Sequence, residues 1–194
     1  MNIGACRRCW LVWKRLALSS GVDVDSTHVS GGWWRHVVAG ADVYFEPPDP
    51  ADNRWQRGAI VEALYFADSE ATAWAEWYRY LAEAGVAPEQ GLPRDFWRWE
   101  ISLSEVANLS DEGRLARVGL PALQPTRLQW PAFQPVGERL HHEGWPALLS
   151  ASAARPVGQT LCVFRTSREV PGTQPLPPPT TVTQAPVVPT GMRT

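Results

Sequence analysis

The sequence predicts a mixed α+β domain, a compact mixed sheet with flanking helices, because strand patterns and helix patterns alternate along its central part. Two segments carry most of this prediction. Residues 96–103 alternate apolar and polar side chains, as in a strand that buries one face. Residues 69–84 combine capping residues with apolar side chains at helical spacing. The length of 194 residues fits one domain with tails better than two domains.

Three shorter apolar segments are expected to supply further strands. Residues 33–38 and 62–67 precede the expected helix, and residues 161–164 form a final buried strand. Residues 47–53, between the first two strands, contain three prolines and are expected to form a loop.

The helix over residues 69–84 has recognisable ends. Ser69 is its N-cap, Glu70 places a negative charge in the first turn, and Gly85 ends it. The expected apolar stripe of this helix consists of Ala73, Trp77, Tyr80, Leu81 and Ala84.

A second helix is expected to begin at Pro131, a residue that favours the first helical position. Pro135 lies within the same stretch and opposes the helix, because proline lacks a backbone N–H. Residues 150–155 follow as a loop of small side chains, which allows a ligand to approach the backbone closely. The side chains expected on one face of the helix are Phe133, Val136, Gly137 and Leu140.

The two ends of the chain differ in composition from its centre. Residues 1–30 show no clear period and are expected to form a weakly ordered leader. Residues 170–194 contain seven prolines and almost no charge, so they are expected to form a disordered Pro/Thr-rich tail that can be deleted without loss of fold or activity. The catalytic domain is therefore predicted at residues 31–169.

Charge and composition argue against several classes of protein. The formal net charge of -2 and the pI of about 6.1 do not favour direct nucleic-acid binding. The sequence has no apolar run of about 18 residues that could span a membrane, and its N-terminal apolar patch is too short for a signal peptide. A cytoplasmic protein is expected.

No metal site is expected. Cys6 and Cys9 form a lone CxxC with no second ligand pair, and Cys162 stands apart. His141 and His142 are adjacent, with no carboxylate at a matching spacing.

Four residues of the predicted domain could carry chemistry, and each has a structural alternative. Arg35 lies in a strand and could point into a site or out to solvent. Arg54 stands beside a Trp and could stack while binding a phosphate, or form a surface ion pair. Tyr65 could line a site or pack in the core. Glu76 lies about 80° from the centre of the helix stripe, where it could face a cleft or pair with Arg79 on the surface.

Together with their neighbours these residues resemble the RES-domain family over residues 33–168. The order fits that family, and Arg54, Tyr65 and Glu76 follow one another at intervals of 11 residues. The matching motifs are Trp34-Arg35-His36-Val37, Asn53-Arg54-Trp55 with Gly58, Ala63 to Ser69, Ala75-Glu76, Pro131 to Gln134, Ser152 to Arg155, and Leu161 to Phe164.

The resemblance implies a fold similar to ADP-ribosyltransferases of the diphtheria-toxin type. It also implies a toxin of a toxin–antitoxin pair that consumes NAD⁺ as a substrate, by hydrolysis or with inorganic phosphate as the acceptor. Some family members are described as ADP-ribosylating a protein. The implied partner is an antitoxin with a helix-turn-helix part that blocks the active site.

The family roles carry over to individual positions. Arg35 and Arg54 match the arginines of the NAD⁺ pocket, Tyr65 its aromatic residue, Glu76 its acidic residue and Ser152 its serine. The resemblance implies catalytic roles for Glu76, Arg35 and Tyr65, and NAD⁺ binding by Arg35, Arg54, Tyr65 and Ser152.

Two positions depart from the family pattern. His36 stands where many members have Tyr, and Ala151 where many have Pro. These departures keep open a degenerate NAD-binding module without enzymatic activity, beside a glycohydrolase or phosphorylase and an ADP-ribosyltransferase.

Physical chemistry is consistent with the implied reaction. When nicotinamide leaves, positive charge develops on the ribose, as in glycoside hydrolysis. The carboxylate of Glu76 can stabilise that charge, and arginines can bind the two phosphates through forked hydrogen bonds. Tyr65 can offer a flat face to the nicotinamide ring, and Ser152 a hydrogen bond to its amide or to a phosphate.

Overall fold

The sheet is organised by two long antiparallel strands, β1 and β3. The computed structural model describes residues 21–45 and 51–193. Within them the pairing of β1 with β3 runs from Asp25 opposite Asn108 to Val38 opposite Arg94. The elements in chain order are β1 (Asp25–Val38), β2 (Glu62–Ala67), α2 (Glu70–Ala84), η1 (Pro88–Gly91), β3 (Arg94–Leu109), α3 (Glu112–Arg117), η2 (Arg127–Gln129), α4 (Trp130–His142), β4 (Ala147–Ala151), β5 (Gln159–Arg165) and β6 (Thr173–Val182).

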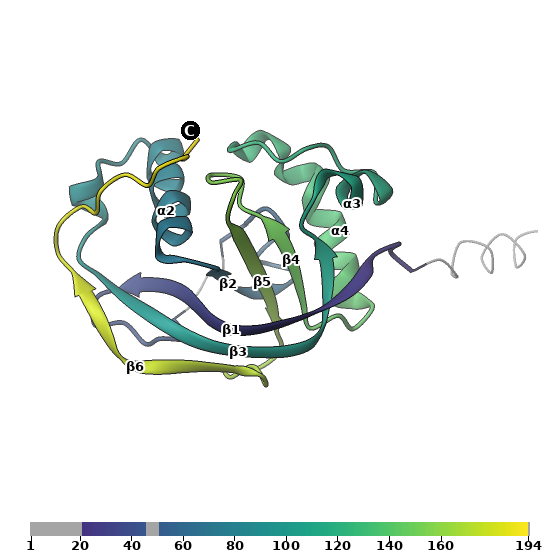
Figure 1. The fold of residues 1–194 in the computed structure, drawn as a ribbon, viewed down its shortest axis with the longest axis horizontal. Helices are drawn as coiled ribbons and strands as arrows, with labels where there is room; N and C mark the ends of the chain where they lie inside the picture. Colours follow the sequence, from purple (N-terminus) through teal and green to yellow (C-terminus); the bar gives the residue numbers. More distant parts are fainter. Residues whose placement is uncertain (1–20, 46–50, 194) are drawn as a thin grey trace, which may run out of the picture.

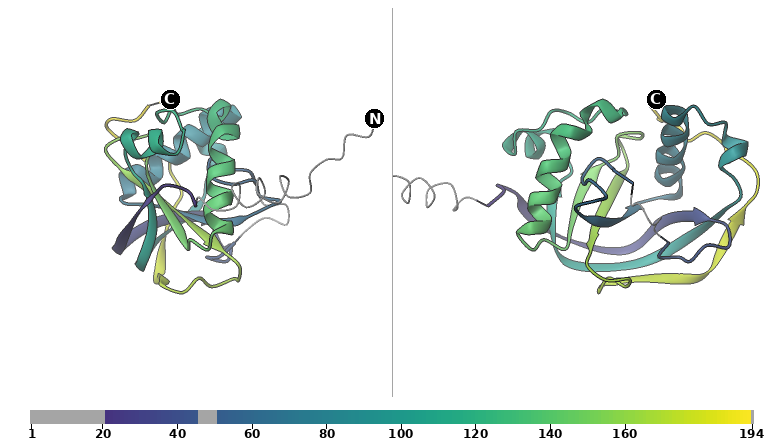
Figure 2. Two further views of the ribbon diagram at one scale, coloured as in Figure 1. Left: turned by 90° about the vertical axis from the view of Figure 1, so that its right-hand side faces the viewer. Right: turned by 180° about the vertical axis from the view of Figure 1, so that it is seen from behind.

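The described strands form one mixed sheet in the order β1-β2-β5-β4-β3-β6. Because β1 pairs with β3 as well as β2, the first five strands close on themselves. Among the described strands β3 and β4 pair in parallel, and the other neighbouring pairs of this sheet are antiparallel. α2 and α4 stand on the same side of the long strands, with β2, β5 and β4 between them (Figures 1 and 2). The predicted mixed α+β architecture is confirmed.

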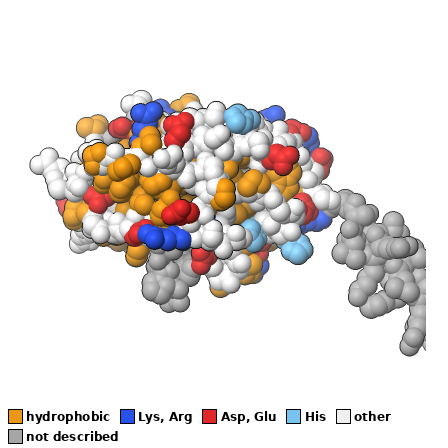
Figure 3. Space-filling view, turned by 90° about the horizontal axis from the view of Figure 1, so that it is seen from below, with side chains coloured by type: hydrophobic (Ala, Val, Ile, Leu, Met, Phe, Trp, Pro, Cys, Tyr) orange, Lys and Arg blue, Asp and Glu red, His pale blue; other side chains and the backbone are white. Residues whose placement is uncertain are grey.

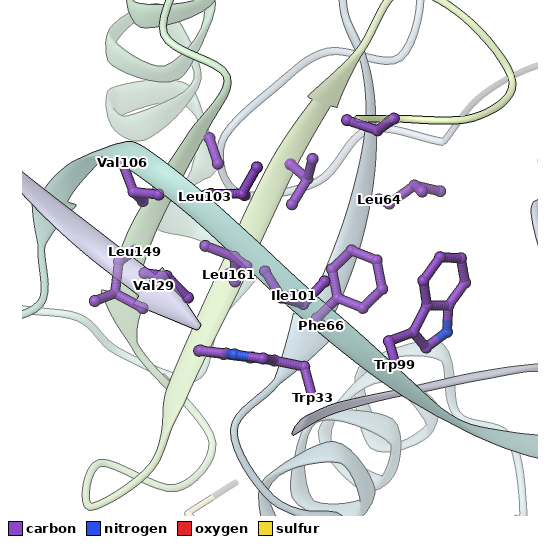
Figure 4. Close-up of a cluster of buried hydrophobic side chains, with 13 residues drawn as sticks. Val29, Trp33, Leu64, Phe66, Trp99, Ile101, Leu103, Val106, Leu149 and Leu161 are labelled. Carbon is purple, nitrogen blue, oxygen red and sulfur yellow. The ribbon is translucent and has the colours of Figure 1, made fainter. Parts of the chain in front are cut away.

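The inner face of the closed strands holds a core of aliphatic side chains around two buried tryptophans and a phenylalanine (Figure 4). Trp33 and Trp99 are directly opposite each other in the β1–β3 register, and Trp99 has no exposed surface. Phe66 of β2 meets the edge of Trp99, with 5.0 Å between ring centroids. Large aromatic side chains bury much apolar area each, so few residues fill this interior.

Helix α2 begins and ends as the sequence predicts. The Ser69 hydroxyl accepts a hydrogen bond from the Thr72 N–H (3.2 Å), and Gly85 takes the left-handed conformation that ends the helix, at φ 65°. The buried face is nevertheless turned relative to the predicted stripe. Tyr80 is 49% exposed, whereas Trp74 is buried against Phe96, because the long strand β3 passes on that side.

The predicted disordered tail is wrong for its first half. Residues 173–182 form β6, which pairs antiparallel with the first half of β3. Composition suggested disorder because such a segment was not expected to bury enough apolar surface to offset its ordering entropy. Proline also has no N–H to donate to a neighbouring strand. At the edge of a sheet, however, one side of the backbone needs no partner, so prolines are tolerated there. Seen from the β6 side of the molecule, hydrophobic side chains gather over one half of the face (Figure 3).

The predicted domain boundaries are also too narrow at the N-terminal end. β1 begins at Asp25, inside the expected leader, and its first residues pair with the last residues of β3. β3 is correspondingly longer than the predicted 96–103 strand. Such long strands are hard to delimit from sequence, because only part of each alternates in burial.

The remaining elements agree in part with the sequence. α4 forms around Pro135, which lies in its second turn and leaves one carbonyl of the first turn without its helical donor. The helix α3 and the strand β4 were not predicted, and β4 takes up the start of the expected 150–155 loop. Residues 1–20, with Cys6 and Cys9, and most of the expected 47–53 loop lie outside the described residues.

Candidate functional site

A cleft of about 510 Å³ opens between α2, β1 and the segment around Arg54. Arg35, Arg54, Tyr65 and Glu76, four residues selected from the sequence, all line it. They come from separate elements: a strand, a loop, a second strand and a helix. The fold therefore brings together side chains that are up to 41 positions apart in the sequence, counted from residue 35 to residue 76.

Glu76 is held at both oxygens of its carboxylate. Oε1 accepts hydrogen bonds from the Ser152 hydroxyl (2.7 Å) and the Ala154 N–H (3.2 Å). Oε2 accepts from Nε of Arg79 at 3.0 Å. The side chain keeps 25% of its surface exposed, so the carboxylate is fixed in position and still reaches the cleft. The pairing with Arg79 expected of a surface Glu is present, but at the wall of a cleft.

Ser152 lies behind Glu76 and does not line the cleft. It is only 1% exposed, and its hydroxyl both donates to Glu76 and accepts from the Arg155 N–H at 2.9 Å. Both hydrogen-bonding roles of the hydroxyl are thus engaged within the protein. The geometry favours orientation of the Glu76 carboxylate over the expected direct contact with NAD⁺.

Arg54 is buried at 9% exposure and is held by the segment before α4. Its guanidinium donates to the Gln124 carbonyl (2.7 Å) and to Oε1 of Gln129 (3.2 Å), and it lies over the Phe133 ring. Burial, followed by the nearby charge of Arg79, lowers the pKa of Arg54 to about 10. Arg54 is therefore a cation at neutral pH, stacked on a Phe where a Trp was expected.

Arg35 connects β1 to the segment that follows it. Its guanidinium donates to the carbonyls of Val43 (2.8 Å) and Phe45 (3.3 Å). The side chain lines the cleft from the strand, so the inward orientation considered in the sequence is the one observed. Arg35 both shapes the cleft wall and adds positive charge to it.

Tyr65 presents its ring to the cleft, while its hydroxyl is used elsewhere. The hydroxyl donates to Oε1 of Gln56 at 2.6 Å and accepts from the Trp55 N–H at 3.4 Å. Burial, with Cys162 close by, raises the pKa of Tyr65 well above its ordinary value. Tyr65 therefore stays neutral, which suits a stacking surface better than a proton donor or acceptor.

Two further arginines line the cleft, and sequence reasoning did not select them as site residues. Arg79 is held by Glu76 and Glu83 on its own helix. Arg94 differs, because its guanidinium binds a neutral side chain: Nη2 donates to Nδ1 of His36 at 3.0 Å. Within residues 21–45 and 51–193 it makes no ion pair with a carboxylate, and its Nε is buried without a hydrogen-bond partner. No local pattern marks Arg94, which stands at the start of an ordinary strand.

The described lining is strongly electropositive. Arg35, Arg54, Arg79 and Arg94 line the cleft with one acidic side chain, Glu76, while Glu83 pairs with Arg79 from outside the lining. A partly buried positive charge with no carboxylate partner among the described residues, as at Arg94, raises the free energy of the folded protein. A ligand with two negative charges would relieve that repulsion, and arginine binds phosphate oxygens through paired, charge-assisted hydrogen bonds.

Comparison with known proteins identifies the family. A family model described as the RES domain matches residues 27–183, about four fifths of the chain. The chain belongs to the RES-domain family. The match includes most of β1 and all of β6, so the RES domain extends beyond the predicted 31–169 at both ends.

The RES-domain fold of this chain is similar to a solved toxin. The structure concerned is the crystal structure of the M. tuberculosis MbcT–MbcA toxin–antitoxin complex, with a TM-score of 0.71 and 21% sequence identity. The similarity covers 81% of this chain and 87% of that one. At this identity the comparison shows a shared fold. No curated protein matches the sequence significantly.

In the described residues, no helix is both long and apolar enough to cross a membrane. The same part of the chain contains no group of three or more His, Cys, Asp or Glu side chains placed to hold a metal ion.

His36, one of the two departures from the family pattern, is built into the cleft wall. Its ring stacks on Trp74, with 5.4 Å between centroids and 7° between planes. Burial, then the charges of Arg94 and Arg35, lower the pKa of His36 to about 3. His36 is therefore neutral near pH 7, and its unprotonated Nδ1 can accept the hydrogen bond from Arg94.

This depressed pKa predicts a loss of stability in mild acid. Below pH 6.5 the unfolded chain protonates His36, while the folded protein resists protonation down to about pH 3. The free energy of unfolding should fall by about 1–2 kcal/mol between pH 7 and pH 5, where carboxylates contribute little. Urea unfolding at both pH values measures it. In His36→Gln the free energy of unfolding should differ much less between the two pH values, whereas His28→Gln, at an exposed histidine, should keep the full difference. If His36→Gln keeps the full difference as well, other groups cause the loss of stability.

Proposed function

We propose that this RES-domain protein is the toxin of a toxin–antitoxin pair and degrades NAD⁺ by cleaving the bond between nicotinamide and ribose. The observation that carries the proposal is the Glu76 carboxylate, fixed by Ser152 and the Ala154 N–H beside several arginines in one cleft. Membership of the RES family supports the assignment. So does the fold shared with the toxin of the MbcT–MbcA complex.

The proposed chemistry needs one fixed negative charge beside the ribose. As the bond from C1′ to the nicotinamide nitrogen breaks, its electron pair leaves with the ring and positive charge develops on the ribose. The Glu76 carboxylate stabilises this charge. Its hydrogen bonds already hold it in place, so the carboxylate does not need to reorient during the reaction. Water then adds to C1′ and loses a proton, giving ADP-ribose; attack by inorganic phosphate gives the ribosyl phosphate instead.

The other cleft residues bind the parts of NAD⁺ that do not react. The arginines hold the pyrophosphate, above all Arg94, which has no carboxylate partner among the described residues. The ring of Tyr65 offers a stacking surface for nicotinamide, while its hydroxyl is engaged by Gln56. No metal ion is part of the proposed reaction.

The proposed partner is a cognate antitoxin that covers the cleft and has a helix-turn-helix part. The similar solved toxin is in a complex with its antitoxin, which supports such a pair. We also propose that the fold is related to that of ADP-ribosyltransferases and that the protein acts in the cytoplasm, where NAD⁺ is abundant.

The proposed function is tested by inducing the full chain without an antitoxin and measuring growth and cellular NAD⁺. Growth arrest with a fall in NAD⁺ is expected, and Glu76→Gln expressed at the same level is the control. Product analysis separates free ADP-ribose or its phosphate from a labelled protein, which would indicate a transferase. Unchanged NAD⁺ with folded protein present would overturn the proposal, and NAD⁺ binding without turnover would indicate a non-enzymatic module.

A variant of Arg94 tests the binding of the phosphates. Arg94→Gln is expected to raise KM for NAD⁺ by about tenfold with little change in kcat, because it removes one charge-assisted hydrogen bond made before and during the reaction. Nicotinamide riboside has no phosphate, so any activity on it should be unaffected. The matched control is Arg117→Gln, far from the cleft and paired with Asp25. An equal loss with both substrates would show that Arg94 does not act on a phosphate.

A further inference from the structure

The C-terminal residues 184–193, called the strap here, follow β6 and lie beyond the residues matched by the family model. They run back to α2, and the chain ends beside the upper part of that helix (Figure 1). The hydroxyl of Tyr78 on α2 donates a hydrogen bond to the Pro186 carbonyl. Val188 and Met192 of the strap line a small apolar cavity together with Leu81 of α2. The strap is thus docked on the helix that carries Glu76.

The end of the strap makes two hydrogen bonds to the loop after β4. The Arg193 N–H donates to the Ala154 carbonyl at 2.7 Å. In return Nε of Arg155 donates to the Thr190 carbonyl at 3.2 Å. Two adjacent residues of the loop, Ala154 and Arg155, are therefore fixed from the strap side.

The same two loop residues hold the Glu76 carboxylate from the other side. The Ala154 N–H donates to Oε1 of Glu76 at 3.2 Å, and the Arg155 N–H donates to the Ser152 hydroxyl at 2.9 Å. That hydroxyl in turn donates to the same Oε1 at 2.7 Å. A continuous set of hydrogen bonds therefore connects the strap to the carboxylate through one short loop.

The loop also approaches α2 directly, at a point that depends on a glycine. Arg155 also donates to Oγ1 of Thr72 at 3.3 Å. A Cβ on Gly158 would lie 2.0 Å from that same Oγ1, so only glycine allows the loop to approach the helix this closely. The loop is small and rests against α2, and the strap closes it from outside.

We propose that the strap is a positioning element that keeps the Ala154–Arg155 loop, and through it the Glu76 carboxylate, in the orientation needed for catalysis. The expected effect of the strap on the reaction rate rests on the proposed NAD⁺ cleavage. The hydrogen bonds between the strap and the loop do not depend on that activity. Without the strap the Ala154 carbonyl and the Arg155 guanidinium lose their hydrogen bonds to Arg193 and Thr190. Glu76 would then be oriented less well, although the cleft arginines that bind the substrate would remain in place.

The test compares the full chain with a chain that stops after Thr183 and so keeps β6. Hydrogen–deuterium exchange should become at least about tenfold faster in residues 152–158 of the shorter chain and stay unchanged in β5, because native amide exchange reports local opening. For NAD⁺ cleavage, kcat should fall by about tenfold, the effect of losing one hydrogen bond to a charged group, with KM changed less than twofold. Adding a peptide of residues 184–194 should restore both values in a saturable way.

A full-length variant guards against misfolding of the shortened chain. Met192→Asp should release the strap from its apolar cavity and reproduce both effects, while Val187→Asp, at a residue 92% exposed, should reproduce neither. Unchanged exchange in residues 152–158 on strap removal would overturn the proposal. So would unfolding of both the shortened chain and Met192→Asp, because the strap would then be needed for folding. A full chain that never turns over NAD⁺ would overturn the proposed function, while the exchange result would still decide the role of the strap.

Discussion

Replacing Glu76 with Gln is expected to lower kcat for NAD⁺ cleavage by about 10²–10³-fold, or roughly 3–4 kcal/mol, the usual effect of removing one preorganised electrostatic group. Gln keeps an oxygen that can accept from Ser152 and from the Ala154 N–H, so the shape of the site is retained. What is lost is the negative charge that faces the developing positive charge on the ribose. KM should change much less, because the arginines bind the phosphates in the ground state and the transition state alike.

Stability should change little in Glu76→Gln. The new amide group would face the guanidinium of Arg79, which costs no more than about 1 kcal/mol for a partly exposed pair. Steady-state NAD⁺ consumption beside a thermal melt separates the two effects. Glu83→Gln is the matched control, since Glu83 binds the same Arg79 from outside the cleft lining and its loss should change kcat by less than about threefold. Full activity in Glu76→Gln would remove Glu76 from the chemistry, and an unfolded variant would make it structural.

The parts of this protein that were predictable from sequence are those specified by neighbouring residues. β2 lies at the expected residues 62–67, and α2 lies between its expected cap at Ser69 and Gly85. The N-cap hydrogen bond and the left-handed glycine act within one turn of the helix, so they can be identified in a single sequence. The resemblance to the RES family also predicted Arg54 and Glu76 in one site, and both line the cleft.

The parts that were not predictable depend on residues far apart in the chain. β6 is a strand because β3 offers it a free edge, although the paired residues Arg94 and Val182 are 88 positions apart, counted from residue 94 to residue 182. Arg94 lies at the cleft because the first half of β3 passes beside α2. Ser152 was expected at the substrate, and its burial behind Glu76 follows from how the loop after β4 folds onto α2. No local pattern carries such information, because the same residues could pair otherwise in another fold.

Replacing Ser152 with Ala is expected to lower kcat by about 10–10²-fold, since a hydrogen bond to a charged group contributes roughly 1.5–3 kcal/mol. The variant removes the hydroxyl that donates to Glu76 at 2.7 Å and also the acceptor of the Arg155 N–H. KM for NAD⁺ should stay within about twofold, because the hydroxyl is buried and does not reach the substrate. Ser167→Ala, whose hydroxyl bonds only the nearby Glu169 carbonyl, is the control. A rise in KM without a fall in kcat would indicate direct substrate binding instead.

Combining the two substitutions decides whether Ser152 acts through Glu76. If the serine only orients the carboxylate, Ser152→Ala should change kcat by less than about twofold once Glu76 is already Gln, because the charge that it positions is gone. Independent contributions would instead multiply, and the double variant would then lose about 10³–10⁵-fold. The effects of two substitutions on the activation free energy usually do not add when the two residues are in direct contact. The interaction energy between Ser152 and Glu76 should therefore be close to the whole effect of Ser152→Ala in the wild-type chain. A multiplicative loss would place Ser152 in a separate role and weaken the case that the loop after β4 serves to hold the carboxylate.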